Sequence, residues 1–139
     1  MRIYLDANVI LDYLLDSRDP FHESAVEVMR LVASRRIAGG FSTTQATDLY
    51  YHLRKAAGDD VARRALRGLY SLCDLYATPP SACLDALDSG IPDYEDAVQI
   101  ETARHNACDL ILTRNLRDYE DSSVSYMDPA GFLSFVGVR

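Results

Sequence analysis

The sequence lacks tryptophan, and cysteine is scarce, with three among 139 residues. Cys73, Cys83 and Cys108 are odd in number and show none of the close spacings of metal-binding cysteines, so we expect reduced thiols and no structural zinc site. No apolar run approaches the roughly 20 residues that cross a bilayer, which argues against a membrane partner. Strand-like sequence begins directly after Met1, so we expect no signal peptide and a cytoplasmic protein.

Positive charge is also in short supply. The chain carries 14 Lys and Arg against 21 Asp and Glu, a formal net charge of -7. This balance argues against a broad basic face for nucleic acid, although part of the acidic excess could serve to share bound cations. Local clusters occur at Arg35-Arg36, Arg54-Lys55 and Arg63-Arg64-Arg67, and their simplest interpretation is solvated helix faces.

The length and the hydrophobic fraction of 48% fit one ordinary domain over residues 1–139. Strand-like segments are expected at 2–5, Phe41, 75–77, 110–113 and 124–127. Helices are expected at 8–15, from Pro20, from Ser42 or Thr43, from Asp59, at 81–87, from Asp93 and at 129–135. Gly39-Gly40 is interpreted as a break that ends the second helix. Alternating strands and helices predict an α/β fold with a mainly parallel sheet of four to five strands, covered on both faces.

Polar residues follow the strands of this predicted sheet. Asp6 closes the first strand and Asn115 follows strand 110–113, so both belong at the carboxyl edge, where α/β folds place ligand chemistry. Asp48 lies in the second turn of the helix after Phe41, on one face with Thr44. Asp96 is compatible with the same edge, but the topology does not force it there.

Each carboxylate also has a simpler interpretation. Asp6 could be only a helix N-cap, and Asp93 with Asp96 could be only a capping arrangement. Asp48 could be a solvated helix residue, and Asp118 a loop carboxylate.

If these carboxylates meet, their repulsion raises their pKa values unless a cation compensates. Mg²⁺ or Mn²⁺ suits such an oxygen-rich site and would support phosphodiester hydrolysis. His22, His52 and His105 are scattered, and no catalytic triad stands out.

Four segments together resemble a PIN domain, in the right order and over nearly the whole chain. They are Tyr4-Leu5-Asp6-Ala7-Asn8-Val9-Ile10-Leu11-Asp12, then Thr44 with Asp48, then Asp93-Tyr94-Glu95-Asp96-Ala97, then Thr113-Arg114-Asn115-Leu116-Arg117-Asp118-Tyr119. The resemblance implies a three-layer α/β/α sandwich, Mg²⁺ or Mn²⁺, and cleavage of single-stranded RNA. Small members look like the toxin half of VapBC toxin–antitoxin pairs, which implies a cognate antitoxin, or like free-standing relatives.

The resemblance also implies roles for individual residues. Asp6 would be the first metal ligand and Asp96 the central one, with Asp93 beside it. Asp48 stands where the family more often has Glu, and Asn115 where many members have an acidic residue, with Asp118 three positions further on. Both departures put the second-metal site in doubt.

Three further residues would support the ligands. Asn8 and Thr113 would orient ligands or water, and Thr44 would support the site from the third helix.

The leading hypothesis is therefore a metal-dependent ribonuclease. The alternative is a catalytically weak PIN-like module that binds RNA or protein, and a third hypothesis is a phosphatase or nucleotide hydrolase. Apolar positions on two helices predict a homodimer, as the family resemblance does: Leu49, Leu53, Leu66 and Leu69. Five tyrosines are candidates for base contacts, although tyrosines at helical spacing are more often half-buried core residues: Tyr13, Tyr50, Tyr51, Tyr94 and Tyr119.

Overall fold

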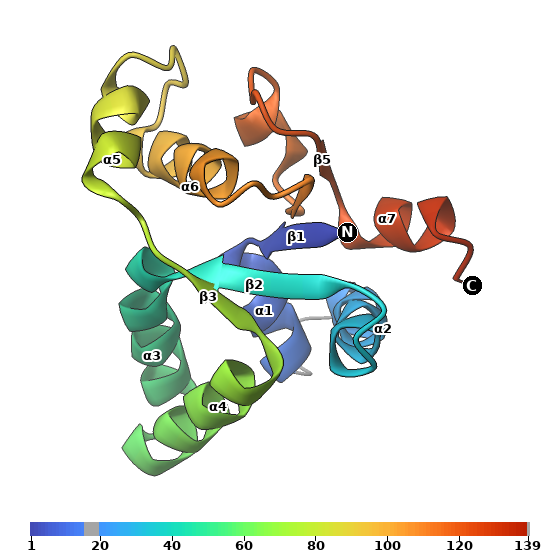
Figure 1. Cartoon of the computed structure of the whole chain (residues 1–139). Coiled ribbons are helices and arrows are strands. Elements are labelled where there is room, and N and C mark those ends of the chain that lie inside the picture. The colour runs from blue at the N-terminus through green and yellow to red at the C-terminus, as the bar shows by residue number, and fades with distance from the viewer. Residues whose placement is uncertain (16–19, 139) are drawn as a thin grey trace.

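The computed structural model describes residues 1–15 and 20–138, which form a five-stranded, all-parallel sheet flanked by helices (Figure 1). The spatial order is β3-β2-β1-β4-β5. The strands are β1 (Arg2–Leu5), β2 (Ala38–Ser42), β3 (Asp74–Tyr76), β4 (Leu110–Leu112) and β5 (Tyr126–Met127). The helices are α1 (Ala7–Leu14), α2 (Phe21–Ala33), α3 (Thr43–Ala57), α4 (Asp59–Leu72), α5 (Pro80–Leu87), α6 (Tyr94–His105), α7 (Pro129–Phe135) and the short 3-10 helix η1 (Leu116–Tyr119). The predicted α/β fold with a parallel sheet is confirmed.

The sheet separates two apolar cores because the side chains of a strand alternate between its faces. Ile3 and Leu5 of β1 join the core formed with α1, α2, α3 and α4, whereas Tyr4 joins the opposite core with Ile100 of α6. Figure 1 shows α1 to α4 on one side of the sheet and α5 and α6 on the other. Burial on both faces explains why the central strands β1 and β4 are strongly apolar.

The interpretation of Gly39-Gly40 as a break is wrong, because both glycines lie inside β2. They pair with Ile3 and Tyr4 of β1. A Cβ on Gly39 would lie 2.6 Å from the Val32 side chain, and a Cβ on Gly40 would lie 2.5 Å from the Asp74 carbonyl oxygen. These positions need glycine because neighbouring groups approach the backbone closely, and not because the chain turns there.

Gly40→Ala should therefore lower the free energy of unfolding by about 3 kcal/mol, since the added methyl group also meets the Tyr76 ring at 2.7 Å. Gly68→Ala is the matched control, because Gly68 lies within α4 and its Cβ would meet nothing within 4 Å. That change should instead raise the free energy of unfolding by about 0.5–1 kcal/mol. Denaturant titration measures both, and equal stability of the two variants would contradict the packing argument.

Several element ends differ from the sequence prediction by a few residues. β5 spans only Tyr126–Met127, and Leu116–Tyr119, expected as loop, forms η1. The start of α3 agrees with the prediction: Ser42 is its N-cap, and the Ser42 N–H donates to Gln45 Oε1 at 2.9 Å. Among the described residues, no helix is both long and apolar enough to cross a membrane.

Candidate functional site

Asp6 links the first strand to the first helix at the carboxyl edge of the sheet. Its N–H donates to the Leu112 carbonyl oxygen at 2.9 Å, and α1 begins at the next residue. Asp6 occupies the N-cap position, yet its side chain makes no hydrogen bond of capping geometry. Its Oδ2 instead accepts from the Thr113 hydroxyl at 2.8 Å. The Asp6 carboxylate is therefore bonded to Thr113 at the end of β4, while the Ala7 and Asn8 N–H groups at the start of α1 also lower its pKa.

Thr113 connects the end of β4 to this carboxylate. It is fully buried, and its Oγ1 accepts from the Asn115 N–H at 3.1 Å while donating to Asp6. One hydroxyl thus fixes both the orientation of Asp6 and the path of the loop that carries Asn115. The Asn115 side chain itself is exposed at the start of η1.

The start of α6 separates the roles of Asp93 and Asp96. Asp93 Oδ1 accepts from the Asp96 N–H at 3.0 Å, so Asp93 is the N-cap. The Asp96 carboxylate lines a hollow of about 260 Å³. Carboxylates dominate the lining of this hollow, which consists of Ile91, Pro92, Asp93, Asp96, Arg117, Asp118, Glu120 and Asp121.

The electrostatics of these groups show that the carboxylates are crowded. Burial raises the pKa of Asp96 to about 6, with further contributions from Asp93, Asp118, Asp6 and Glu95. Burial also raises the pKa of Asp6, against the opposing effect of the Thr113 hydroxyl. Neither shift is expected of an isolated capping residue in water. A divalent cation with a preference for oxygen ligands would relieve both the desolvation and the repulsion.

The remaining predicted site residues lie on α1 and α3. Asp48 is exposed on α3, and no hydrogen bond or ion pair within residues 1–15 and 20–138 joins it to Asp6 or Asp96. Thr44 Oγ1 lies 2.7 Å from Ser42 Oγ at the end of β2. Asn8 is half-buried in the first turn of α1.

A buried polar network next to the site was not predicted from the sequence. The Tyr4 hydroxyl donates to Ser42 Oγ at 3.0 Å and to Gln99 Oε1, and Gln45 Nε2 donates to the Leu5 carbonyl oxygen at 3.4 Å. These bonds join β1, β2, α3 and α6, the elements that carry Asp6, Asp48 and Asp96. The available signal was Gln99, a polar residue between the apolar Val98 and Ile100 in a buried helix.

Arg114 holds the loop after β4 from the other side. Its Nε lies 3.4 Å from Oδ2 of Asp12, a carboxylate that is only 1% exposed. Its guanidinium carbon also lies 4.3 Å from the centre of the Phe21 ring. These contacts fix the segment between Thr113 and Asn115, and the positive charge partly offsets the raised pKa of Asp6.

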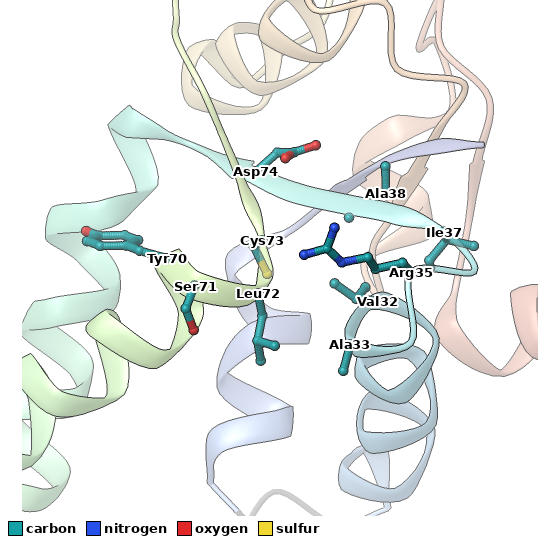
Figure 2. Close-up of a pocket in the computed structure, with 11 residues that line it drawn as sticks. Val32, Ala33, Arg35, Ile37, Ala38, Tyr70, Ser71, Leu72, Cys73 and Asp74 are labelled. Carbon is teal, nitrogen blue, oxygen red and sulfur yellow. The ribbon is translucent and has the colours of Figure 1, made fainter.

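A hollow of about 480 Å³ lies at the opposite edge of the sheet, where β2 and β3 begin (Figure 2). Arg35, Cys73 and Asp74 line it, and burial raises the pKa of the Cys73 thiol to about 11. A thiol with that pKa is protonated near neutral pH and is a poor nucleophile. This hollow contains none of the carboxylates discussed above.

A third group of ionisable side chains joins α5 to α6. Asp85, Glu101 and His105 bring three potential ligand atoms within 4.8 Å of one another. Arg104 Nη2 lies 2.9 Å from Asp85 Oδ2 and 2.7 Å from Glu101 Oε2, so one guanidinium already pairs with both carboxylates. We interpret it as an ion-pair network between two helices.

Comparisons with known proteins agree with this architecture. A family profile described as PIN domain matches residues 2–117. A chain from VapBC2 of Rickettsia felis, bound to a promoter DNA fragment, superposes with a TM-score of 0.71 at 12% identity, covering 92% of this chain and 98% of that one.

Two further solved structures agree. A chain from DNA-bound VapBC of Salmonella typhimurium superposes with a TM-score of 0.71 at 18% identity, covering 93% of this chain and 98% of that one. VapC20 of Mycobacterium tuberculosis, a toxin that cleaves the sarcin-ricin loop, superposes with a TM-score of 0.62 at 16% identity, covering 78% of this chain and 86% of that one. At these identities the likeness concerns the fold alone. No curated protein matches the sequence.

Proposed function

Because the chain belongs to the PIN domain family, we propose that it is a metal-dependent ribonuclease acting on single-stranded RNA. The observation that carries the proposal is the electrostatic coupling of Asp6, from the first strand–helix unit, with Asp96, from the third. The Asp93 and Asp118 carboxylates raise the pKa of Asp96 further. Clustered carboxylates repel one another, and strongly shifted pKa values of this kind concentrate at sites that bind a cation or transfer a proton.

The donor set fits Mg²⁺ or Mn²⁺, since it consists of carboxylate oxygens with no thiol or imidazole among them. Asp6 and Asp96 would hold the ion, with Asp93 and Asp118 as the neighbouring carboxylates that raise the Asp96 pKa, and Asp48 of α3 as a further proposed ligand. When bound, such an ion polarises a phosphoryl oxygen and lowers the pKa of a water molecule. Thr113 keeps the Asp6 carboxylate oriented, and Asn115 and Asn8 offer neutral amides to orient substrate or water.

Two features favour a second candidate function, a weakly catalytic module that binds RNA or protein. Asn115 contributes no charge where many relatives carry an acid, and Asp48 reaches less far than Glu. Both would weaken a second metal position.

We also propose a toxin role with a cognate antitoxin, in line with the VapBC complexes of its structural relatives. A short antitoxin gene directly upstream would support this role, and its absence would favour a free-standing nuclease.

The proposed homodimer needs a different basis from the one predicted. Leu49, Leu53 and Leu69 are buried in the core between α3, α4 and the sheet, and Leu66 packs against it half-buried, so together they offer little docking surface. Exposed apolar side chains instead flank the edge strand β3, at Tyr70, Leu72 and Leu75. Sedimentation at micromolar concentration tests the proposal, and a monomer without any partner would remove it.

The purified chain should cleave a labelled single-stranded RNA in Mg²⁺ or Mn²⁺ and stop when EDTA is added. Hydrolysis by water should leave a 5′-phosphate and a 3′-hydroxyl. Cleavage that continues in EDTA, or a 2′,3′-cyclic phosphate product, would identify the substrate 2′-hydroxyl as the nucleophile and contradict the mechanism. Binding of RNA without cleavage at any metal concentration would favour the weakly catalytic module.

A further inference from the structure

One exposed face of α3 extends outward from the candidate site. Its members follow each other at intervals of four, three and four residues and therefore share a side of the helix. They are Thr44, Asp48, Tyr51 and Lys55, and all are exposed. The opposite side of α3 is buried through Gln45, Leu49 and Leu53. From Thr44 to Lys55 this exposed face covers roughly 16 Å.

The inner end of this face is held by the buried network beside the carboxylates. Thr44 Oγ1 contacts Ser42 Oγ at 2.7 Å, and Ser42 Oγ accepts from the Tyr4 hydroxyl at 3.0 Å. Tyr4 lies two residues before Asp6 on β1. The face therefore begins at a fixed place next to the proposed metal ligands.

The outer end is basic and aromatic, in contrast to the chain as a whole. Residues 49–58 contain His52, Arg54 and Lys55 but no Asp or Glu, whereas the whole chain has a net charge of -7. Within residues 1–15 and 20–138, neither Arg54 nor Lys55 forms an ion pair. A hollow of about 390 Å³ is lined by Tyr51, Arg54 and Lys55.

Tyr51 has the exposure of a contact residue rather than a core residue. Its side chain is 57% exposed, and its ring lies 5.5 Å from the His52 ring at an interplanar angle of 76°. An exposed ring beside two cations matches the needs of single-stranded nucleic acid, in which bases stack on aromatic side chains and phosphates pair with Lys and Arg.

We propose that the outer part of this α3 face, Tyr51 and Lys55 with the adjacent Arg54, binds the single-stranded RNA next to the phosphate that is cleaved. Tyr51 stacks on one base, and Arg54 and Lys55 contact the flanking phosphates. This inference rests on the proposed ribonuclease function. It adds that the bound RNA strand extends from the carboxylates outward along α3. It also accounts for RNA binding by an acidic protein, because the basic contacts are concentrated along one helix.

Binding can be measured separately from cleavage. The anisotropy of a fluorescein-labelled 12-nucleotide single-stranded RNA is followed in EDTA, where cleavage is not expected. Tyr51→Ala should weaken binding about tenfold, and Tyr51→Phe should bind like the parent because stacking needs only the ring. Arg54→Ala with Lys55→Ala should reduce the slope of log K against log salt by about 1.4, or about 0.7 for each lost phosphate contact.

Arg64→Ala with Arg67→Ala is the matched control. It removes the same charge from exposed positions of α4, away from the side that buries Ala62 and Leu69. An equal loss of affinity in this control would show a nonspecific charge effect and overturn the proposal. Parent-like RNA binding by Tyr51→Ala would also overturn the proposal. If that variant in addition lost a self-association seen by sedimentation, the face would be a protein contact instead.

The two proposals fail in different ways. A parent that binds RNA through Tyr51 but never cleaves it refutes the ribonuclease and supports the α3 face. A parent that cleaves RNA while all α3 variants bind normally supports the ribonuclease and refutes the α3 face.

Discussion

Asp96→Asn should reduce RNA cleavage at least about a hundredfold without destabilising the metal-free protein. A metal ligand contributes several kcal/mol to transition-state stabilisation, and each 1.36 kcal/mol changes the rate tenfold. Asn has the shape of Asp, so the packing at the start of α6 is conserved. Because Asp93 provides the cap, the Asp96 side chain is not needed to begin the helix. Removing its charge relieves repulsion from Asp93, Asp118 and Asp6.

The melting temperature shows whether Asp96 is a metal ligand or an ordinary acidic residue in the first turn of a helix. Metal-free Asp96→Asn should melt a few degrees above the parent, which corresponds to about 1 kcal/mol, and should lose most of the stabilisation that Mg²⁺ gives the parent. Asp6→Asn should behave in the same direction. Asp60→Asn is the matched control, since Asp60 is also an acid in a first helical turn, at the start of α4.

Asp60→Asn should keep parental cleavage and should melt slightly lower, because it loses only a favourable interaction with the helix dipole. If Asp96→Asn matched Asp60→Asn in both cleavage and melting, Asp96 would be an ordinary helix-terminal residue. The site would then have no central ligand.

Local sequence signals such as helix caps and apolar periodicity predicted most helices and strands, because at these positions local preference and tertiary packing favour the same structure. Ser42, one of the two predicted caps, begins α3, and Asp93 caps α6 as expected. The position of Asp6 followed from one rule, that parallel strands end at a common edge. Whether Asp6 served as a cap or as a site residue depended on Thr113, which lies 107 residues away. No local pattern contains that contact.

The errors also arose from long-range packing. Gly39-Gly40 has the composition of a turn, and only the approach of Val32, Asp74 and Tyr76 gives it a place inside a strand. The leucines of α3 and α4 were interpreted as surplus apolar surface, because the sequence alone does not show that they pack against each other and the sheet. The homodimer itself stays a prediction.

The pH dependence of metal-free stability should show the crowding of the carboxylates directly. The Asp96 pKa is about 6 in the folded chain, against an ordinary value of 3.8 for an aspartate. Between these values the folded state keeps a proton that the unfolded state has lost. The contribution of Asp96 is therefore fully present below about pH 4 and is lost as the pH rises through about 6. Asp6, whose pKa is also raised, acts in the same direction.

Other groups have the opposite sign, so the comparison must be made with a variant. Asp59 has a lowered pKa because of hydrogen bonds from Tyr50 and Arg63, and its stabilisation is lost as the pH falls. The difference in melting temperature between the parent and Asp96→Asn cancels this effect. Relative to Asp96→Asn, the melting temperature of the parent should fall by a few degrees from pH 4 to pH 7, and the difference should then level off.

Mg²⁺ should reverse the trend, because the ion binds the deprotonated carboxylates and competes with protons. The stabilisation of the parent by Mg²⁺ should increase as the pH rises through about 6, while Asp96→Asn should respond weakly at every pH. Thermal melts from pH 4 to pH 8, with and without Mg²⁺, measure both effects. A difference between parent and variant that stays constant with pH would mean that Asp96 is as solvated as a surface carboxylate. Crowding at the edge of the sheet would then no longer be an argument for a metal.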